Sequence, residues 1–257
     1  MSSIEDFIKT IAKLRSPNGC PWDKEQTHES LKKYLIEETY EAIDAIDKNN
    51  PTELKEELGD ILLQIVLHAQ IASESNQFSF DEIAKSINKK MISRHPHVFS
   101  DTMVKNAEEV MINWEKLKQA EKPEQKDIFS NIPKSLPALL KGLEVSKKAA
   151  KVGFEWQNES ELWEKLKSEM VELNEVCKSK EKEKQIEEFG DLLFMMVNIA
   201  RWYKLDPEES LNKGIKKFVK RFNKIEQHVK KNKDKKLEDL SAFELNNLWE
   251  KVKEEEG

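Results

Sequence analysis

The chain has 257 residues, of which 36% are charged and 38% hydrophobic, and its formal net charge is -6. This mildly acidic balance argues against a broad nucleic-acid or membrane surface, and no apolar run reaches the roughly 18 residues of a membrane helix. With only 7 Gly and 8 Pro, the sequence predicts an all-α fold. Residues 1–16 lack a signal-peptide core, and Cys20 and Cys177 show no metal-type spacing, so we expect a cytoplasmic protein with free thiols.

Five helices are expected in the first half of the chain. By periodicity and capping residues they cover about residues 4–14, 28–48, 51–67, 80–94 and 106–121. Residues 58–67 are apolar on nearly all sides of their helix. Partner helices or a second subunit must therefore cover this helix on several sides.

The second half repeats the plan of the first. Residues 121–136 are polar and proline-containing and are expected to form a linker. Beyond it, residues 153–156 (Gly-Phe-Glu-Trp) echo residues 19–22 (Gly-Cys-Pro-Trp). Further helices are expected at about residues 160–179, 182–204, 207–231 and 240–253. The sequence therefore predicts two tandem helical-bundle repeats, residues 1–120 and residues 137–257.

Four carboxylates recur in each repeat at the same offsets of 0, 3, 19 and 22 residues. They are Glu38, Glu41, Glu57 and Asp60 in the first repeat, and Glu169, Glu172, Glu188 and Asp191 in the second. Residues three apart share one helix face, so each quartet can converge between two antiparallel helices. Such a quartet is expected about 0.3 times by chance in this composition. The duplication favours a cation site over solvated helix surface, and carboxylate ligands suit Mg2+ or Mn2+.

A glycine precedes the aspartate in each quartet, at Gly59 and Gly190. A glycine in the middle of a helix costs roughly 1 kcal/mol relative to alanine. Its presence at both places predicts that a helix or a ligand approaches the backbone closely there.

Basic residues follow each quartet on the next expected helix. The pairs are Lys90 with Arg94, and Lys217 with Arg221. Each pair puts a point charge and a bidentate fork on one helix face, which suits phosphate oxygens, although either could be solvated surface. Trp114 and Trp249 recur near the end of each repeat. Each is either a core residue or a platform on which a nucleobase stacks.

Two further lysines distinguish the second repeat. Lys165 and Lys184 each precede a carboxylate of the second quartet by four residues, where the first repeat has Tyr34 and Glu53. Both lysines are expected on the acidic face, either within reach of a polyphosphate or in ion pairs worth about 0.2–0.5 kcal/mol. We expect residues 137–257 to carry catalysis and the first repeat to be weaker, structural or regulatory.

Together these patterns resemble the MazG family of nucleoside triphosphate pyrophosphohydrolases. The resemblance covers essentially the whole chain, including residues 19–23 and 94–99. It implies an all-α fold, a homodimer, Mg2+ dependence, and cleavage of nucleoside triphosphates to the monophosphate and pyrophosphate. By the same resemblance, the metal ligands are Glu169, Glu172, Glu188 and Asp191, and the nucleotide-contacting residues include Lys217, Arg221 and Trp249.

The residues themselves suit this reaction, which needs charge neutralisation, an activated water and a stabilised pyrophosphate leaving group. Because no base-reading motif is evident, we expect a broad range of ribo- and deoxyribonucleoside triphosphates. Two alternatives stay open: a non-catalytic helical interaction protein with acidic metal-binding clefts, and a narrow-specificity house-cleaning deoxynucleotide pyrophosphatase. The sequence lacks the glycine-rich loop of a P-loop enzyme, and residues 41 and 172 are both Glu where the Glu-x-x-His pattern of a di-iron bundle would place His.

Overall fold

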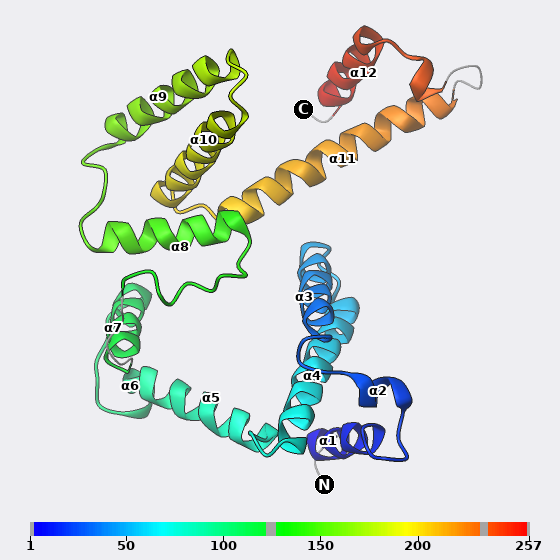
Figure 1. Cartoon of the computed structure of the whole chain (residues 1–257), viewed down its shortest axis with the longest axis vertical. Helices are drawn as coiled ribbons and strands as arrows, with labels where there is room; N and C mark the ends of the chain where they lie inside the picture. Colours follow the sequence, from blue (N-terminus) through cyan, green and yellow to red (C-terminus); the bar gives the residue numbers. More distant parts are fainter. Residues whose placement is uncertain (1–2, 122–126, 232–235, 256–257) are drawn as a thin grey trace. The chain divides into compact units, whose positions relative to one another are not determined.

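A computed structural model of the chain describes residues 3–121, 127–231 and 236–255 (Figure 1). These residues form twelve α-helices and one 3-10 helix, with no strand among them, which confirms the all-α fold. Contacts divide the chain into two compact units, Met1–Pro123 and Glu124–Gly257. Residues 122–126 of the expected linker lie outside the described residues. No described helix combines the length and apolar character that crossing a membrane requires.

The first unit is built around a pair of helices. Its elements are α1 (Ser3–Leu14), α2 (Pro21–Glu25), α3 (Lys32–Asp47), α4 (Pro51–Glu74), α5 (Phe80–Arg94), α6 (Pro96–Phe99) and α7 (Ala107–Ala120). Helices α3 and α4 lie side by side in an antiparallel hairpin, and α1 packs on α4 (Figure 1). Asn50 sets the turn between them, because its side chain accepts hydrogen bonds from the backbone N–H groups of Thr52 and Glu53 at the start of α4.

The core of the first unit lies where α1 and α4 meet the segment before α3. Ile11, Leu31, Val66 and Leu67 are its buried members. Leu58, nearer the start of α4, is 53% exposed. Helices α1, α3 and α5 contact α4, so partner helices cover it on several sides, as its sequence predicts.

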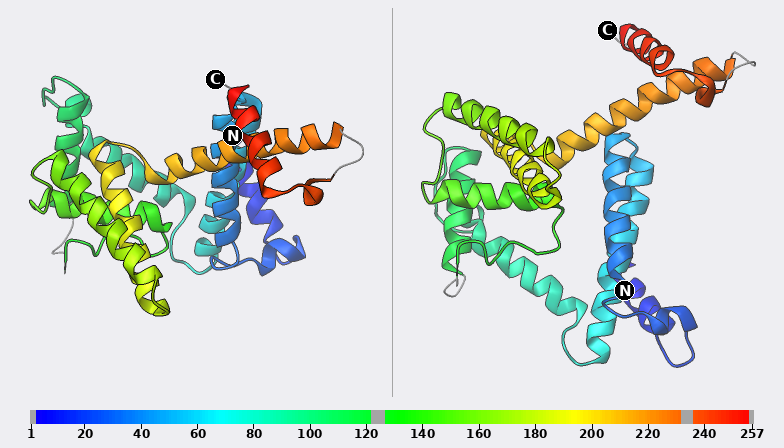
Figure 2. Two further views of the ribbon diagram at one scale, coloured as in Figure 1. Left: turned by 90° about the horizontal axis from the view of Figure 1, so that it is seen from above. Right: turned by 45° about the horizontal axis from the view of Figure 1, so that its top comes forward.

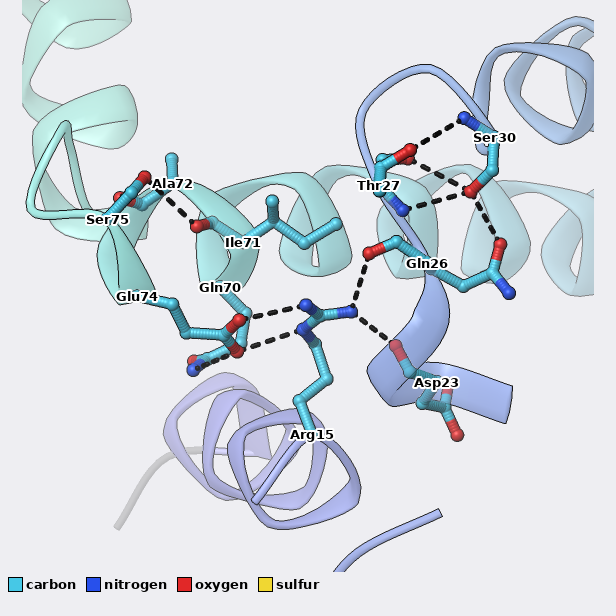
Figure 3. A network of polar contacts seen from close by, with 10 residues as sticks. All are labelled: Arg15, Asp23, Gln26, Thr27, Ser30, Gln70, Ile71, Ala72, Glu74 and Ser75. Carbon is cyan, nitrogen blue, oxygen red and sulfur yellow. Dashed lines mark hydrogen bonds and ion pairs between the residues drawn. The ribbon is translucent and has the colours of Figure 1, made fainter. Parts of the chain in front are cut away.

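Arg15 joins the end of α1 to two other segments of this unit (Figure 3). Its Nε and Nη2 atoms donate to the Glu74 carboxylate at 2.9 and 2.8 Å, and its Nη1 donates to the backbone carbonyls of Asp23 and Gln26. The Arg15 side chain is nearly buried. Because a bidentate pair shielded from water is stronger than an exposed one, it fixes the connector after α1 against α4.

The second unit contains two helix groups, shown from further directions in Figure 2. Its elements are α8 (Ala138–Lys151), α9 (Glu159–Cys177), α10 (Lys182–Trp202), α11 (Pro207–Lys231), the 3-10 helix η1 (Leu237–Asp239) and α12 (Ala242–Glu254). Helix α10 packs on both α8 and α9, over a core of Leu162, Met195 and Ile199. Helices α11 and α12 share a separate cluster around Ile225 and Val252, and α11 also contacts α8 and α10.

Candidate active site

Three carboxylates of the second quartet meet between α9 and α10. Glu169 and Glu172 come from α9 and Glu188 from α10, and each offers an oxygen atom within 4.8 Å of the others. The spacing of three residues places the first two on one face of α9, toward α10. Glu169 is only 7% exposed. Asp191 lies one turn beyond Glu188 and lines a pocket that also contains Glu169.

These carboxylates repel one another. Burial raises the pKa of Glu188, and the charges of Glu172, Asp191 and Glu169 raise it further. The ionised form of Glu188 is therefore destabilised in the fold, and a cation between the helices would relieve the repulsion. The donor set consists of carboxylate oxygens alone, which fits Mg2+ or Mn2+ better than zinc, whose structural sites favour sulfur and nitrogen ligands.

The structure brings Lys165 to this cluster but not Lys184. The Nζ atom of Lys165 lies 2.7 Å from Glu169 Oε1 and 3.9 Å from Glu172 Oε1, and the hydrogen bond to Glu169 raises the pKa of the lysine. Lys184 instead places its ammonium 2.7 Å from Glu181 at the start of α10. In this structure the acidic face therefore carries one of the two lysine ammonium groups that the spacing predicts.

The first quartet forms a similar cluster between α3 and α4. Glu38, Glu41 and Glu57 bring their carboxylate oxygens within 4.8 Å of one another. Burial, followed by the charge of Asp60, raises the pKa of Glu38, and burial together with Glu41 raises the pKa of Glu57. Gln64, one turn beyond Asp60, is almost fully buried, and its Oε1 atom has no hydrogen-bond partner in the described part of the chain.

No lysine accompanies the first cluster at the positions that match Lys165 and Lys184. Tyr34 packs on the core of the first unit and makes an edge-on ring contact with Trp22 at 5.9 Å. Glu53 accepts hydrogen bonds from Lys48 and Asn50 at the start of α4. The two clusters thus share their carboxylates and differ in their countercharge.

The glycines beside the two quartets face open space. A β-carbon added at Gly59 or Gly190 would meet no atom within 4 Å. The expectation that a helix of the same chain approaches these backbones is therefore wrong for the described residues. The sequence could not reveal this, because the same glycine is compatible with a helix, a ligand or a second subunit beside it.

The basic pair of the second repeat lies on α11, in the α11–α12 group. The Arg221 guanidinium carbon lies 5.8 Å from the centre of the Trp249 ring, and the Phe218 ring lies 5.0 Å from the same ring. Trp249 also packs against the cluster of buried residues that joins these two helices. Lys217 lies one turn before Arg221, so the pair shares one helix face.

The matching arginine of the first repeat is bound to a carboxylate. Arg94 also lies over a tryptophan, with its guanidinium carbon 5.3 Å from the centre of the Trp114 ring. However, its Nε and Nη2 atoms donate to Glu121 Oε2 at 3.0 and 2.6 Å. This pairing holds the pKa of Glu121 below its ordinary value. A phosphate would have to compete with Glu121 for Arg94.

A pocket of about 330 Å³ opens beside the second carboxylate cluster, among α8, α9, α10 and residues 154–157. Its lining includes Lys165, Glu169 and Asp191 together with Phe154, Trp156 and Phe194. Asn198 also lines it. The sequence interpretation missed Asn198, although its position seven residues after Asp191 places it two turns along the same helix face.

Fold and site together define a class of helical protein in which duplicated helix pairs gather carboxylates that could hold a metal ion. Comparison with known proteins is more specific. The model of the MazG nucleotide pyrophosphohydrolase domain matches residues 26–99 and again residues 157–226. The chain therefore belongs to the MazG family, and the enzyme class expected from its sequence is confirmed.

Three relatives illustrate this membership. The chain is 44% identical to "Nucleoside triphosphate pyrophosphohydrolase/pyrophosphatase MazG" of Thermotoga maritima, over 97% of this chain and 95% of the relative. It is 37% identical to the "Nucleoside triphosphate pyrophosphohydrolase" of Escherichia coli, over 100% of this chain and 99% of the relative. It is also 47% identical to "Uncharacterized protein YabN" of Bacillus subtilis, over 97% of this chain and 51% of that longer protein.

Proposed function

We propose that this protein hydrolyses nucleoside triphosphates, both ribo and deoxyribo and with a broad range of bases, to the monophosphate and pyrophosphate. We further propose that the reaction requires Mg2+ and takes place in the second repeat. The observation that carries this proposal is the cluster of Glu169, Glu172 and Glu188 with the Lys165 ammonium beside it, next to a pocket. The names of the relatives from Thermotoga maritima and Escherichia coli support the substrate class.

In this proposal the second quartet holds the cation, which would be Mg2+ or Mn2+. Its ligands are Glu169, Glu172, Glu188 and Asp191. When bound, the metal supplies charge neutralisation to the phosphates and lowers the pKa of a coordinated water. One carboxylate of the quartet accepts the proton of the attacking water as the water oxygen bonds to the α-phosphorus. The bond from that phosphorus to the bridging oxygen then breaks, and pyrophosphate leaves.

Cations on the protein take up the charge of the polyphosphate. Lys165 is already at the cluster, and Lys217 and Arg221 on α11 supply a point charge and a bidentate fork for phosphate oxygens. We include Lys184 because a long lysine side chain can exchange an exposed partner such as Glu181 for a phosphate. Trp249 would position Arg221 through the contact of its ring with the guanidinium, or stack on the base.

The test compares Glu172→Ala with its counterpart Glu41→Ala in an assay of pyrophosphate release with Mg2+. Removing a metal ligand from the catalytic repeat should reduce kcat about 100-fold or more. The Glu41 variant should stay within about threefold of the wild type, because its cluster lacks a lysine at the carboxylates. Loss of activity in the Glu41 variant alone would assign catalysis to the first repeat. Absence of pyrophosphate release from any triphosphate by the wild type would instead support an interaction protein.

Substrate breadth has its own test. The eight ordinary ribo- and deoxyribonucleoside triphosphates should compete for one site, with kcat/KM values spread over about tenfold, because stacking tolerates every base. One triphosphate preferred over the others by about 1,000-fold or more would instead indicate a narrow house-cleaning pyrophosphatase.

We also propose a cytoplasmic homodimer. Four apolar residues of α10 are largely exposed in the single chain and recur at spacings of three and four: Ile186, Phe189, Leu193 and Met196. This spacing places them in one stripe, the pattern of a helix that packs on another helix. A second copy of the chain would remove this stripe from water. The two free thiols, Cys20 and Cys177, suit a reducing compartment.

A further inference from the structure

Asn198 lines the pocket beside the proposed catalytic cluster. Its Oδ1 accepts a hydrogen bond from the Ser146 hydroxyl at 2.7 Å, and its Nδ2 donates to the Phe194 carbonyl at 2.9 Å. An amide nitrogen has two hydrogens and an amide oxygen has two lone pairs. One hydrogen and one lone pair of Asn198 therefore have no partner among the described residues.

The orientation of this amide is fixed by its neighbours. Arg201 Nε donates to Ser146 Oγ at 2.6 Å, and the serine hydroxyl in turn donates its single hydrogen to Asn198 Oδ1. The Phe194 carbonyl can only accept a hydrogen bond, so it must face the amide nitrogen, and this removes the ambiguity that amide groups usually have between oxygen and nitrogen. Ser146 is almost fully buried, so the hydrogen bond is shielded from water.

Arg201 is itself held from the other side. Its Nη1 and Nη2 atoms donate to the two carboxylate oxygens of Glu155, the latter at 2.6 Å. The arginine side chain is only 13% exposed. Glu155, Arg201, Ser146 and Asn198 thus form one continuous chain of hydrogen bonds from the connector through α8 to α10. Such second-layer support is what holds a recognition group in one geometry.

Aromatic side chains accompany the amide. Phe154, Trp156 and Phe194 line the same pocket, and Phe154 is 83% exposed. The pocket volume of about 330 Å³ is at the lower end of the range for small-molecule sites. Flat apolar walls with one oriented donor and acceptor suit a flat heterocycle that carries a donor and an acceptor side by side. Adenine, guanine, cytosine and uracil all present such an edge.

We propose that this pocket binds the nucleobase and that Asn198 hydrogen-bonds to its edge. The inference rests on the proposed function, since Lys165, Glu169 and Asp191 line the same pocket and would receive the phosphates of the same nucleotide. An amide can pair with any of the bases, so Asn198 detects a base without choosing among them. This assigns base binding to the α8–α10 pocket, and the role of Trp249 is then to position Arg221.

The first repeat lacks this feature. Counting seven residues from the aspartate of each quartet gives Asn198 in the second repeat and Leu67 in the first. Leu67 is 2% exposed and belongs to the core of the first unit. A side chain buried in this way and without polar atoms cannot read a base edge. Base recognition at Asn198 therefore belongs to the second repeat alone.

The test measures binding to the full chain with Mg2+ by calorimetry. The probes are a non-hydrolysable ATP analogue with an α,β-imido bridge, and inorganic tripolyphosphate, which has no base. Asn198→Leu should weaken binding of the analogue about tenfold, because its hydrogen bonds are lost, and leave tripolyphosphate unchanged. Ser146→Ala, which frees the amide to rotate, should weaken the analogue alone by about threefold. Asn174→Leu, at an exposed position of α9, is the control and should alter neither.

Three results would overturn the inference. The first is unchanged binding of the analogue by Asn198→Leu, which leaves the proposed function standing. The second is equal weakening of both probes, which would show that Asn198 acts on the fold or the phosphate site. The third is a Trp249→Ala variant that binds the analogue no better than tripolyphosphate, together with a Trp156→Ala variant that still binds the analogue better. This result would place the base at α11–α12. If Asn198→Leu fails to fold, Ser146→Ala decides. A wild type that binds neither probe would refute the proposed function itself.

Discussion

Glu188 shows how a single residue can trade stability for cation binding. Its pKa is raised, so its ionised form destabilises the folded chain above that pKa, and this cost is relieved as the pH falls. Glu188→Gln removes one of the repelling charges. We therefore expect the variant to melt at a higher temperature than the wild type in the presence of a chelator at pH 7.

The same substitution should remove most of the stabilisation that Mg2+ gives, because one ligand is lost. Differential scanning calorimetry with and without Mg2+ measures both effects. Glu187→Gln, at the exposed neighbouring position, is the control and should retain the Mg2+ effect. A cation site here would be contradicted if Glu188→Gln melted at a lower temperature than the wild type in chelator, and if Mg2+ raised its melting temperature as much as that of the wild type.

Glu155 predicts a dependence of stability on pH that is opposite to that of Glu188. The Arg201 guanidinium holds the pKa of Glu155 below its ordinary value. A depressed carboxyl pKa adds stability that is fully present above the unfolded pKa and is lost as the pH falls through the folded pKa. Glu155→Gln should cost about 1–2 kcal/mol at pH 7. The difference from the wild type should shrink as the pH falls from about 4.5, the ordinary pKa of the carboxyl, through its lowered pKa in the fold.

Urea unfolding at a series of pH values checks this prediction. Glu175→Gln, at an exposed position of α9, should follow the wild type throughout. If the free energy of unfolding of Glu155→Gln differed from that of the wild type by a constant amount over the whole acid range, packing rather than the ion pair would cause the loss of stability.

The site residues that sequence could predict are those whose geometry is local. Glu169 and Glu172 share a helix face because they are three residues apart, and Lys165 reaches Glu169 because it is one turn away. Asn198 depends on Ser146 and Arg201, and its link to Ser146 joins residues 52 positions apart. No spacing rule connects such residues. The prediction for Lys184 fails for a different reason, since Glu181 lies only three residues before it and pairs with its ammonium at 2.7 Å.

At the scale of the helices, periodicity predicted the long elements and capping residues predicted their ends. The expected helix at residues 207–231 matches α11, and the one at 80–94 matches α5. The short helices α2 and α6 were missed, because each is a single turn that begins with a proline and is too short to show a period. Helix α8 was also missed, since the repeat comparison began after it, at residue 153.

The start of α9 gives a prediction for a helix. Asn158 caps it by accepting a hydrogen bond from the backbone N–H of Glu161, and this helix carries two of the carboxylates proposed to be catalytic. Asn158→Ala should lower the free energy of unfolding by about 1 kcal/mol, because that N–H loses its partner. Asn174→Ala, within the same helix and exposed, should be neutral or slightly stabilising, because alanine is the better helix former. Equal effects of the two variants in urea unfolding would contradict the capping role.

At the scale of the whole molecule, the exposed stripe of α10 predicts self-association. Leu193→Glu places a charge in the middle of the stripe, and burying an unpaired charge is costly. We expect this variant to elute as a monomer where the wild type elutes as a dimer, measured by size-exclusion chromatography with light scattering. Lys178→Glu introduces the same residue at an exposed position just after α9, outside the stripe, and should remain a dimer. A wild-type monomer at all concentrations would refute the dimer.

The Lys165 ammonium has a consequence for the order in which ligands bind. At the second cluster it already occupies the neighbourhood of two carboxylates, whereas the first cluster has no lysine at that position. A free divalent ion must displace the ammonium at one site and only water at the other. Bare Mg2+ should therefore load the first repeat before the second. The repeat proposed to be catalytic would receive its metal together with the triphosphate, whose phosphates would offer Lys165 a new partner in place of Glu169.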